Sequence, residues 1–279
     1  MKVYDGFVFN DDYDVLELRL EIMYDHVDKI TIVESDHTFS NKPKDYNFEK
    51  NIKRYEKWLD KINYIKVESP KFESAWDNEH WQSAQIKLGW SDATPEDVIL
   101  AAINVDEIIR PETIELIKNT NYDYYTLWMP IFYFKLNYTD RNQHYSPWAK
   151  AFRGVTGGEI ISPIAKLVPP DGKSHINVHH SGWHFSWLGD NEYIKNKLKS
   201  YSHTEFDNSN ILDDLNIEEN IKRGEDHLKR GSVTWSPVKL DDYFPKVILD
   251  NKEKYSQYIL PDSDNTVFDF HGHNILELV

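Results

Sequence analysis

Short apolar runs alternate with longer charged stretches through the first half of the chain. Residues 3–9 (VYDGFVF), 29–34 (KITIVE) and 62–67 (INYIKV) are rich in β-branched and aromatic side chains, and each is predicted to form a β-strand. The stretches between them, residues 16–23 and 47–60, are rich in good helix formers and are predicted to be helical. The first half therefore has the strand–helix–strand order of an α/β protein.

A fourth apolar run, residues 97–103 (DVILAAI), is typical of a central strand covered on both faces. Residues 76–88 are predicted to form the helix before it, and a further helix is predicted over residues 111–118, with proline at a favourable first position. This order predicts an α/β fold with a mostly parallel central sheet flanked by helices. Ligands of such folds lie beyond the carboxyl ends of the strands, where Glu34 and Asp106 are expected to approach one crevice.

The second half of the chain is less regular. Residues 124–136 are rich in aromatic side chains, residues 150–168 contain a Gly157-Gly158 turn, and residues 179–187 are dense in His and Trp. The chain has no internal repeat and no Pro- or Ser-rich linker. One continuous domain is therefore expected.

Two predicted helix ends carry charges that are expected to stabilise them. Asp11 or Asp12 is placed to cap the helix that follows the first strand. Residues 190–199 are also predicted to be helical, and three lysines near the end of this segment complement the helix dipole: Lys195, Lys197 and Lys199.

The acidic charge and the absence of cysteine narrow the functional classes. The 279 residues include 47 Asp and Glu against 32 Lys and Arg, and the formal net charge of −15 argues against binding nucleic acid or anionic membranes. With no cysteine, disulfides and thiolate metal sites are excluded. The N-terminus is too quickly acidic for a signal peptide, and no stretch approaches the ~20 apolar residues of a membrane helix. We therefore expect a soluble, cytoplasmic protein.

The sharpest local feature is the acidic turn Asn104-Val105-Asp106-Glu107, which directly follows the fourth strand. Carboxylates at a strand end can hold a hard divalent cation from a rigid platform, and such a cation stabilises a diphosphate leaving group. A solvated turn or a helix cap is the alternative interpretation of this tetrapeptide.

A second candidate is a set of histidines in the second half. Neutral imidazole suits cations such as Mn²⁺, although packing or surface exposure is the more common role of a histidine. The set does not have the spacing of a zinc helix. Its members are His175, His179, His180, His184 and His203.

A third candidate is Gly189-Asp190-Asn191-Glu192, which opens the helix predicted over residues 190–199. A carboxylate at this point can act as a general base that deprotonates an acceptor hydroxyl. A helix N-cap followed by an acidic first turn is the alternative, and the local sequence favours it.

Eight segments, in this order, resemble glycosyltransferase family 17, the family of the β-1,4-mannosyl-glycoprotein N-acetylglucosaminyltransferase. They extend over about residues 3–205, and the C-terminal tail carries no recognisable motif. The segments are residues 4–9, 16–20, 27–29, 32–35, 38–44, 99–111, 181–189 and 197–205.

The resemblance implies a GT-A-type fold and an inverting glycosyltransferase. It also implies Mn²⁺ or Mg²⁺, a UDP-sugar donor with a GlcNAc-like sugar, and a glycan acceptor. Residues 1–279 would then form one catalytic domain, with a nucleotide-sugar half at about 1–120, an acceptor and metal-completing half at about 121–240, and a tail at 241–279.

By this resemblance, the Asp-x-Asp metal motif of GT-A enzymes maps onto Asn104-Val105-Asp106. The first acid is replaced by Asn104, which keeps an oxygen acceptor but loses the charge. Asp106 is the expected metal ligand. A histidine late in such domains often completes the metal site, and here His203 fits that order, with His184 as the reserve candidate.

The same resemblance supplies the remaining site residues. Asp190 or Glu192 is expected to be the general base. Glu34, Ser40 and Lys42 are expected in the donor site, where Lys42 would meet the diphosphate.

Two other functions fit the same residues. The chain could be a catalytically weakened protein that only binds glycan or nucleotide, with Asn104 marking the lost activity. It could also be a metal-dependent hydrolase that uses the histidines and Asp106. A short, cysteine-free chain of this kind fits a bacterium, phage or large virus better than a Golgi enzyme.

Overall fold

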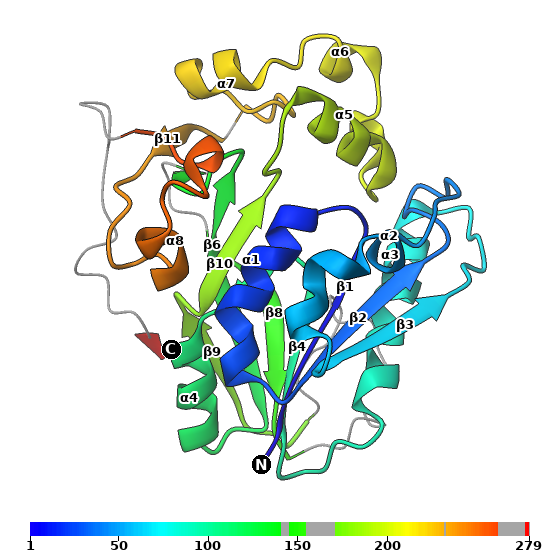
Figure 1. Ribbon diagram of the computed structural model, residues 1–279, viewed down its shortest axis with the longest axis vertical. Helices are drawn as coiled ribbons and strands as arrows, with labels where there is room; N and C mark the ends of the chain where they lie inside the picture. The colour runs from blue at the N-terminus through cyan, green and yellow to red at the C-terminus, as the bar shows by residue number, and fades with distance from the viewer. Residues whose placement is uncertain (141–144, 155–170, 232, 262–276, 279) are drawn as a thin grey trace.

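The computed structural model describes residues 1–140, 145–154, 171–231, 233–261 and 277–278. Across these residues, twelve strands form one curled sheet with helices on both faces (Figure 1). The long path through the sheet has the order β11-β7-β6-β8-β4-β1-β2-β3.

The first half of the chain follows the expected order closely. Its elements are β1 (Val3–Val8), α1 (Tyr13–Met23), a three-residue 3₁₀ turn (Tyr24–His26), β2 (Lys29–Ser35), α2 (Asn47–Lys50), a longer 3₁₀ segment (Ile52–Trp58), β3 (Ile62–Val67), α3 (Ala75–Ala84), a second longer 3₁₀ segment (Gln85–Trp90) and β4 (Val98–Asn104). All four strands predicted from the apolar runs are confirmed. The segments predicted as helices over 47–60 and 76–88 are each part α-helix and part 3₁₀-helix.

The second half contains more strands than its irregular pattern indicates, and the predicted helices over 111–118 and 190–199 are confirmed. The Gly157-Gly158 turn lies outside the described residues. The elements are β5 (Glu107–Ile109), α4 (Pro111–Asn119), β6 (Tyr124–Tyr133), β7 (Tyr138–Asp140), β8 (Tyr145–Phe152), β9 (His175–His179), β10 (Gly182–Ser186), α5 (Asn191–Ser200), α6 (Ser209–Leu212), α7 (Ile217–Arg223), β11 (Trp235–Pro237), α8 (Lys246–Asp250) and β12 (Glu277–Leu278).

The sheet is mixed, so the expectation of a mostly parallel sheet is wrong. Strands β3, β2, β1 and β4 are parallel, because helical crossovers connect them. Beyond β4 the pattern changes: β8 runs antiparallel to both β4 and β6, and β7 runs antiparallel to β6. The connection between β6 and β7 is only a few residues long, and a short connection permits only an antiparallel pair.

Strand β4 lies at the centre of the sheet and is buried on both faces, as its apolar sequence predicts. Its alternate residues Val98 and Leu100 belong to the hydrophobic core that contains α1, α4 and α8. Ile99 and Ala101 face the other side, where they pack with Trp90 of the second longer 3₁₀ segment. Both cores meet at β4, so its carboxyl end is a rigid position in the molecule.

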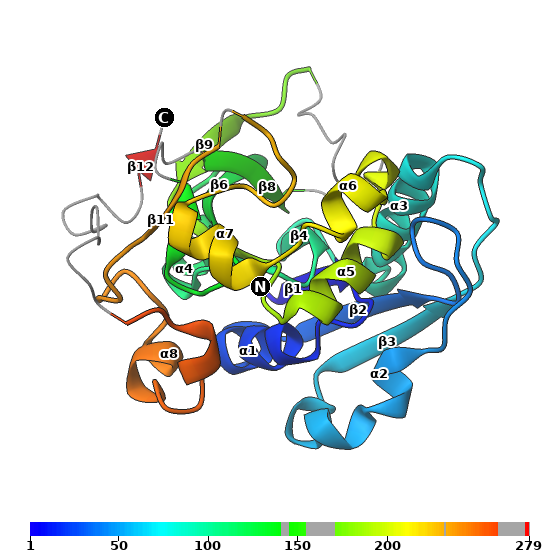
Figure 2. The ribbon, with the colours of Figure 1, turned by 90° about the horizontal axis from the view of Figure 1, so that it is seen from above.

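A third hydrophobic cluster lies beyond the carboxyl ends of the strands. Here Ile194 and Leu198 of α5 pack with Trp187 and Trp235 and with residues of α6 and α7. This packing places α5 across the carboxyl edge of β1 and β2, as seen from above (Figure 2). In the part of the chain that is described, no helix has the length and apolar character needed to span a bilayer.

Candidate active site

Asp106 lies in the turn that follows β4, and its side chain is almost completely buried. Its Oδ1 lies 3.4 Å from Nε2 of His184, and its Oδ2 lies 3.3 Å from Nζ of Lys197. Burial alone would raise the pKa of this carboxyl group, but Lys197 and His184 outweigh burial and hold the pKa well below its usual range. Asp106 is therefore a carboxylate at neutral pH.

A buried ion pair fixes the backbone of this turn. Arg19 of α1 donates from Nε and Nη2 to the two carboxylate oxygens of Asp5 on β1, at 2.9 and 2.6 Å. Its Nη1 donates to the carbonyl oxygens of Val105 at 3.1 Å and Glu107 at 2.8 Å. Both charged side chains are fully buried, and a bidentate guanidinium–carboxylate pair has a defined geometry. The turn is therefore held in place from the α1 side.

Glu107, the next residue along the turn, is also buried. Its Oε2 accepts hydrogen bonds from the backbone N–H of Ile103 at 2.7 Å and of Asn104 at 3.4 Å. Burial and the charge of Asp106 raise the pKa of Glu107 well above its ordinary value. Glu107 therefore stabilises the turn from within and adds a second carboxyl group beside Asp106.

Strand pairing brings His184 beside the turn. Strand β10 runs antiparallel to β5, with His184 opposite Glu107. The ring of Trp148 on β8 packs edge-on against the imidazole, with 4.4 Å between the ring centroids. Gly182 permits the close pairing, because a Cβ at this position would lie 2.1 Å from the carbonyl oxygen of Ile108. Strand register and Trp148 thus set the position of the imidazole.

Three of these side chains fit a divalent cation. Asp106, Glu107 and His184 each present a ligand atom within 4.8 Å of the others. Oδ1 of Asp106 and Nδ1 of His184 are buried and have no hydrogen-bond partner within the described structure. A buried polar atom without a partner is costly, and carboxylate oxygen with imidazole nitrogen is a suitable ligand set for Mn²⁺.

Lys197 of α5 joins two strand ends at this edge of the sheet. Its Nζ lies 2.8 Å from Oδ1 of Asp12, which follows β1, and so contacts both Asp12 and Asp106. Tyr193, one turn earlier on α5, donates its hydroxyl to the same oxygen of Asp12. Burial would lower the pKa of Lys197, but the two aspartates raise it above the ordinary value, so the side chain stays charged.

Asp11 adds another carboxyl group at the same strand end. Burial, together with the charge of Asp12, raises the pKa of Asp11 to about 6. The side-chain amide of Asn10 donates a hydrogen bond to its Oδ1 at 2.8 Å. A carboxyl group with a pKa near neutrality is well suited to accept a proton at physiological pH, so Asp11 joins the candidates for a general base.

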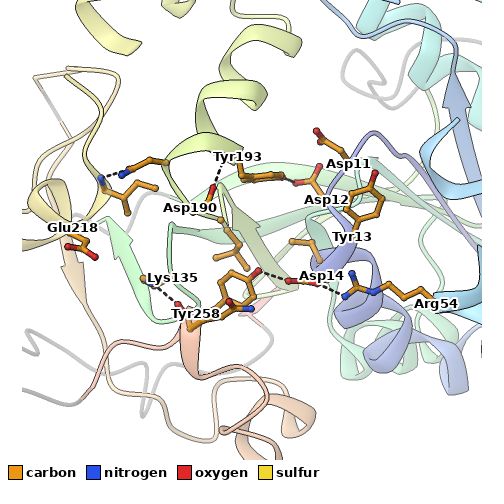
Figure 3. Close-up of a pocket in the computed structure, with 16 residues that line it drawn as sticks. Asp11, Asp12, Tyr13, Asp14, Arg54, Lys135, Asp190, Tyr193, Glu218 and Tyr258 are labelled. Carbon is orange, nitrogen blue, oxygen red and sulfur yellow. Dashed lines mark hydrogen bonds and ion pairs between the residues drawn. The ribbon is translucent and has the colours of Figure 1, made fainter. Parts of the chain in front are cut away.

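A cavity of about 440 Å³ lies beside these groups, between the start of α1, the start of α5 and the 3₁₀ turn Ser256–Tyr258 (Figure 3). It falls within the ~300–1,000 Å³ typical of small-molecule sites. Its lining residues are Asp11, Asp12, Tyr13, Asp14, Val15, Arg54, Lys135, Leu188, Gly189, Asp190, Asn191, Tyr193, Ile217, Glu218, Gln257 and Tyr258.

The two carboxylates expected to act as general base have different surroundings. Asp190 lines the cavity, and its Oδ1 accepts a hydrogen bond from the backbone N–H of Tyr193 at 2.8 Å (Figure 3). It therefore also forms the N-cap of α5, which was the alternative role for this position. Glu192 has an 80% exposed side chain that lies 3.7 Å from Lys195 and is not among the cavity residues.

The structure brings one of the two candidate histidines to Asp106. That residue is His184, the reserve candidate. His203 is 45% exposed, its Nδ1 lies 2.7 Å from Oε1 of Glu205, and its ring packs edge-on against Trp76 at 4.5 Å. The histidine that lies beside Asp106 is therefore on β10, and the histidine that follows α5 does not contact Asp106.

Glu34 lies at the end of β2, as expected, and its carboxylate is fully engaged with the protein. Oε1 accepts from Nζ of Lys44 at 2.6 Å and from the backbone N–H of Asn47 at 2.5 Å. Oε2 accepts from the backbone N–H of Phe48 at 3.0 Å and from the hydroxyl of Tyr64 at 2.8 Å. Glu34 thus binds the N-terminus of α2, and a role in the donor site stays a prediction.

The other donor-site candidates lie on loops at the carboxyl edge. The hydroxyl of Ser40 donates to the carbonyl oxygen of Lys199 at 2.6 Å, and Nζ of Lys42 lies 3.3 Å from Asp207. These contacts tie the loop after β2 to the end of α5. Asn104 is the last residue of β4 and pairs with Val8 of β1.

Sequence reasoning missed the contribution of Asp12, Lys197 and Arg19 to this site. It assigned Asp12 to helix capping, but no side-chain capping bond is formed there, and it assigned Lys197 to the helix dipole. One signal was available: Asp11 and Asp12 follow β1 as Asp106 follows β4, and β1 and β4 are parallel neighbours. Equivalent strand ends place their side chains at the same edge.

Buried carboxylates and an imidazole lie together at the carboxyl edge of an α/β sheet, beside a cavity, which is the arrangement expected of an enzyme site. The sequence pattern of glycosyltransferase family 17 matches residues 1–264. The chain belongs to this family and is a glycosyltransferase, whose partners are a sugar donor and an acceptor. No curated protein matches the chain significantly.

Proposed function

We propose that the protein is an inverting glycosyltransferase with a GT-A-type arrangement, which moves a GlcNAc-like sugar from a UDP-sugar to a glycan hydroxyl with the help of Mn²⁺ or Mg²⁺. The observation that carries this proposal is the buried carboxylate of Asp106 at the carboxyl end of the central strand. Its Oδ1 lies 3.4 Å from Nε2 of His184 and has no hydrogen-bond partner in the described structure. Membership of glycosyltransferase family 17 supports the transfer reaction.

Asp106, His184 and Glu107 are the residues that would hold the cation. Bound there, a divalent cation supplies charge that stabilises the diphosphate as it leaves. Lys197 contacts the other oxygen of Asp106 and keeps that carboxylate oriented. Asn104 occupies the position of the first acid of an Asp-x-Asp motif and offers an amide oxygen without charge.

The carboxylate of Asp190 is the proposed base among the two expected from the sequence, because it lines the cavity. It takes the proton of the acceptor hydroxyl as the acceptor oxygen forms its bond to the anomeric carbon of the donor sugar. The bond between that carbon and the diphosphate oxygen breaks on the opposite face, so the configuration inverts. The nucleoside diphosphate leaves with the bonding electron pair.

The test is nucleoside diphosphate release from a panel of UDP-sugars with Mn²⁺ present. Asp106→Ala is expected to abolish release, whereas Asp213→Ala, at an exposed position of the same residue type, is expected to keep it. Turnover of Asp106→Ala at the wild-type rate would overturn the assignment.

Calorimetry with UDP, with and without Mn²⁺, provides an independent readout. Metal-dependent UDP binding supports the transferase. Glycan binding without UDP binding would instead support a binding protein on the same fold.

A further inference from the structure

The cavity beside α1 lies at the carboxyl edge and is not lined by the proposed metal-binding residues. Asp106, Glu107 and His184 do not line it, whereas Asp12 does. Elements that are distant in sequence bound it, among them the first turn of α1, the first turn of α5, the start of α7 and the turn Ser256–Tyr258 (Figure 3).

Hydrogen bonds hold the tyrosines around the cavity in fixed orientations. The hydroxyl of Tyr258 donates to Oδ2 of Asp14 at 2.5 Å, and the other oxygen of Asp14 pairs with Arg54. The hydroxyl of Tyr193 donates to Asp12. Tyrosine rings offer apolar faces to the C–H side of a sugar ring, and a pre-organised wall lowers the entropic cost of binding.

The charges of the lining disfavour an anionic ligand. Five lining residues are carboxylates, namely Asp11, Asp12, Asp14, Asp190 and Glu218, against the two cations Arg54 and Lys135. Arg54 is engaged by Asp14 and by Glu17, the latter at 2.8 Å. Nζ of Lys135 donates to the backbone carbonyl of Gln257 at 2.6 Å. A diphosphate or uronate in the cavity would therefore face excess negative charge.

A short chain of contacts connects the cavity to the proposed metal site. Asp12, in the cavity wall, lies 2.8 Å from Nζ of Lys197, and the same ammonium lies 3.3 Å from Oδ2 of Asp106. The side chains of Asp12 and Lys197 therefore lie between a molecule bound in the cavity and the carboxylate of Asp106. The cavity is therefore a neighbour of the proposed metal site, as a site for the second substrate must be.

We infer that this cavity is the acceptor site and that it selects an uncharged sugar unit over an anionic one. The inference rests on the proposed function, since it names the acceptor of the same reaction. The tyrosines position the sugar, and the carboxylates accept hydrogen bonds from its hydroxyl groups.

The first experiment blocks the cavity. Gln257 lines the cavity and is exposed. Its backbone carbonyl accepts the hydrogen bond from Lys135, so Gln257→Trp is expected to fill the space and to keep that bond. Ser256→Trp is the matched control, because Ser256 is exposed on the same turn but does not line the cavity. Saturation-transfer NMR would measure binding of methyl glycosides of glucose, galactose, mannose and N-acetylglucosamine, of methyl glucuronide, and of UDP with MgCl₂.

At least one neutral glycoside is expected to bind the wild type and Ser256→Trp, and to bind Gln257→Trp at least about tenfold more weakly. UDP binding is expected to be equal in all three chains. Loss of UDP binding in Gln257→Trp would make the cavity a donor site and overturn the inference. Binding of methyl glucuronide that equals or exceeds binding of the neutral glycosides would also overturn the inference. So would UDP binding without any glycoside binding. Neither result would contradict the proposed transferase activity. Glycoside binding without UDP binding would instead refute the proposed transferase.

A second experiment shifts the selectivity towards an anionic sugar. Asp14→Asn keeps an oxygen for Tyr258 but releases part of the charge of Arg54, so methyl glucuronide affinity is expected to rise about threefold. Glu115→Gln, which removes an exposed carboxylate on α4, is the control and should leave it unchanged. An unchanged affinity in Asp14→Asn would show that charge does not set the selectivity.

Discussion

Nζ of Lys197 lies 3.3 Å from Oδ2 of Asp106 and 2.8 Å from Oδ1 of Asp12. One ammonium group thus joins the residues that follow two adjacent parallel strands, and it ties α5 to the edge of the sheet. The three side chains are at most 16% exposed, so the pairing is only weakly screened by solvent. Removal of the lysine takes the ammonium from two buried carboxylates and leaves Asp106 with His184 alone.

Lys197→Met is therefore expected to lower the free energy of unfolding by about 2 kcal/mol, less than for a fully buried pair because Lys197 is partly exposed. Mn²⁺ should restore more stability to this variant than to the wild type, since the cation replaces the missing charge. Urea denaturation with and without Mn²⁺ measures both effects. Lys195→Met, which breaks an exposed pair on the same helix, should change stability by less than about 0.5 kcal/mol.

Arg19→Leu is expected to cost about 3–5 kcal/mol, because it leaves the buried carboxylate of Asp5 unpaired and frees the carbonyl groups of the turn. The double variant Asp5→Leu/Arg19→Leu should be more stable than Arg19→Leu alone, since it no longer buries a lone charge. Urea denaturation of the wild type, Asp5→Leu, Arg19→Leu and the double variant gives the coupling free energy of the pair. A double variant that is less stable than Arg19→Leu would contradict this account of the pair.

His184 and His203 are expected to contribute differently to metal binding. His184→Gln is expected to weaken Mn²⁺ binding by about 10–100-fold, since the imidazole faces Oδ1 of Asp106. His203→Gln should leave Mn²⁺ binding unchanged, because His203 contacts Glu205 and Trp76 instead. Calorimetric titration with MnCl₂ distinguishes them. A larger loss of Mn²⁺ affinity in His203→Gln than in His184→Gln would identify His203 as the metal ligand.

Gly182→Ala is expected to disrupt the site through the backbone. The added Cβ would lie 2.1 Å from the carbonyl oxygen of Ile108, so β10 must move away from β5 and carry His184 with it. A loss of about 1–3 kcal/mol in stability and a large loss of activity are expected. Gly231→Ala is the control, because no described atom lies within 4 Å of a Cβ there. Thermal unfolding and nucleoside diphosphate release measure the two losses.

Because of His227, the free energy of unfolding is expected to fall in mild acid. Burial lowers the pKa of its imidazole to about 3, whereas the unfolded chain takes up this proton near its usual pKa of ~6.5. Below pH ~6.5 the unfolded state therefore binds more protons, so stability falls as the pH falls from ~6.5 towards 3 and is constant above that window. This group should contribute about 2 kcal/mol to the loss between pH 7.5 and pH 5.

Replacement of His227 by phenylalanine should reduce that loss, because the side chain packs among Tyr133, Phe134 and Trp187 and neither ring nitrogen has a hydrogen-bond partner in the described structure. Urea denaturation of the wild type and His227→Phe at the two pH values gives the comparison. Equal losses in the two chains would show that another group is responsible.

The local pattern of the first half was sufficient to predict its elements. A strand such as β4 is nearly all apolar because both of its faces are covered. This requirement applies to consecutive residues, so it can be recognised in the local sequence. The position of Asp106 at a strand end follows from the same pattern. The mixed sheet did not follow, since the direction of β8 depends on the pairing of residues far apart in sequence.

The acidic turn, its place after a central strand and the resemblance to glycosyltransferase family 17 were determined by the sequence alone. Tertiary structure decided which groups surround Asp106. His184 reaches it through the register of β10 against β5, and Lys197 reaches it because the hydrophobic face of α5 packs over the strand ends. Such contacts join residues about 80 to 90 positions apart, and local hydrophobic periodicity carries no information about them.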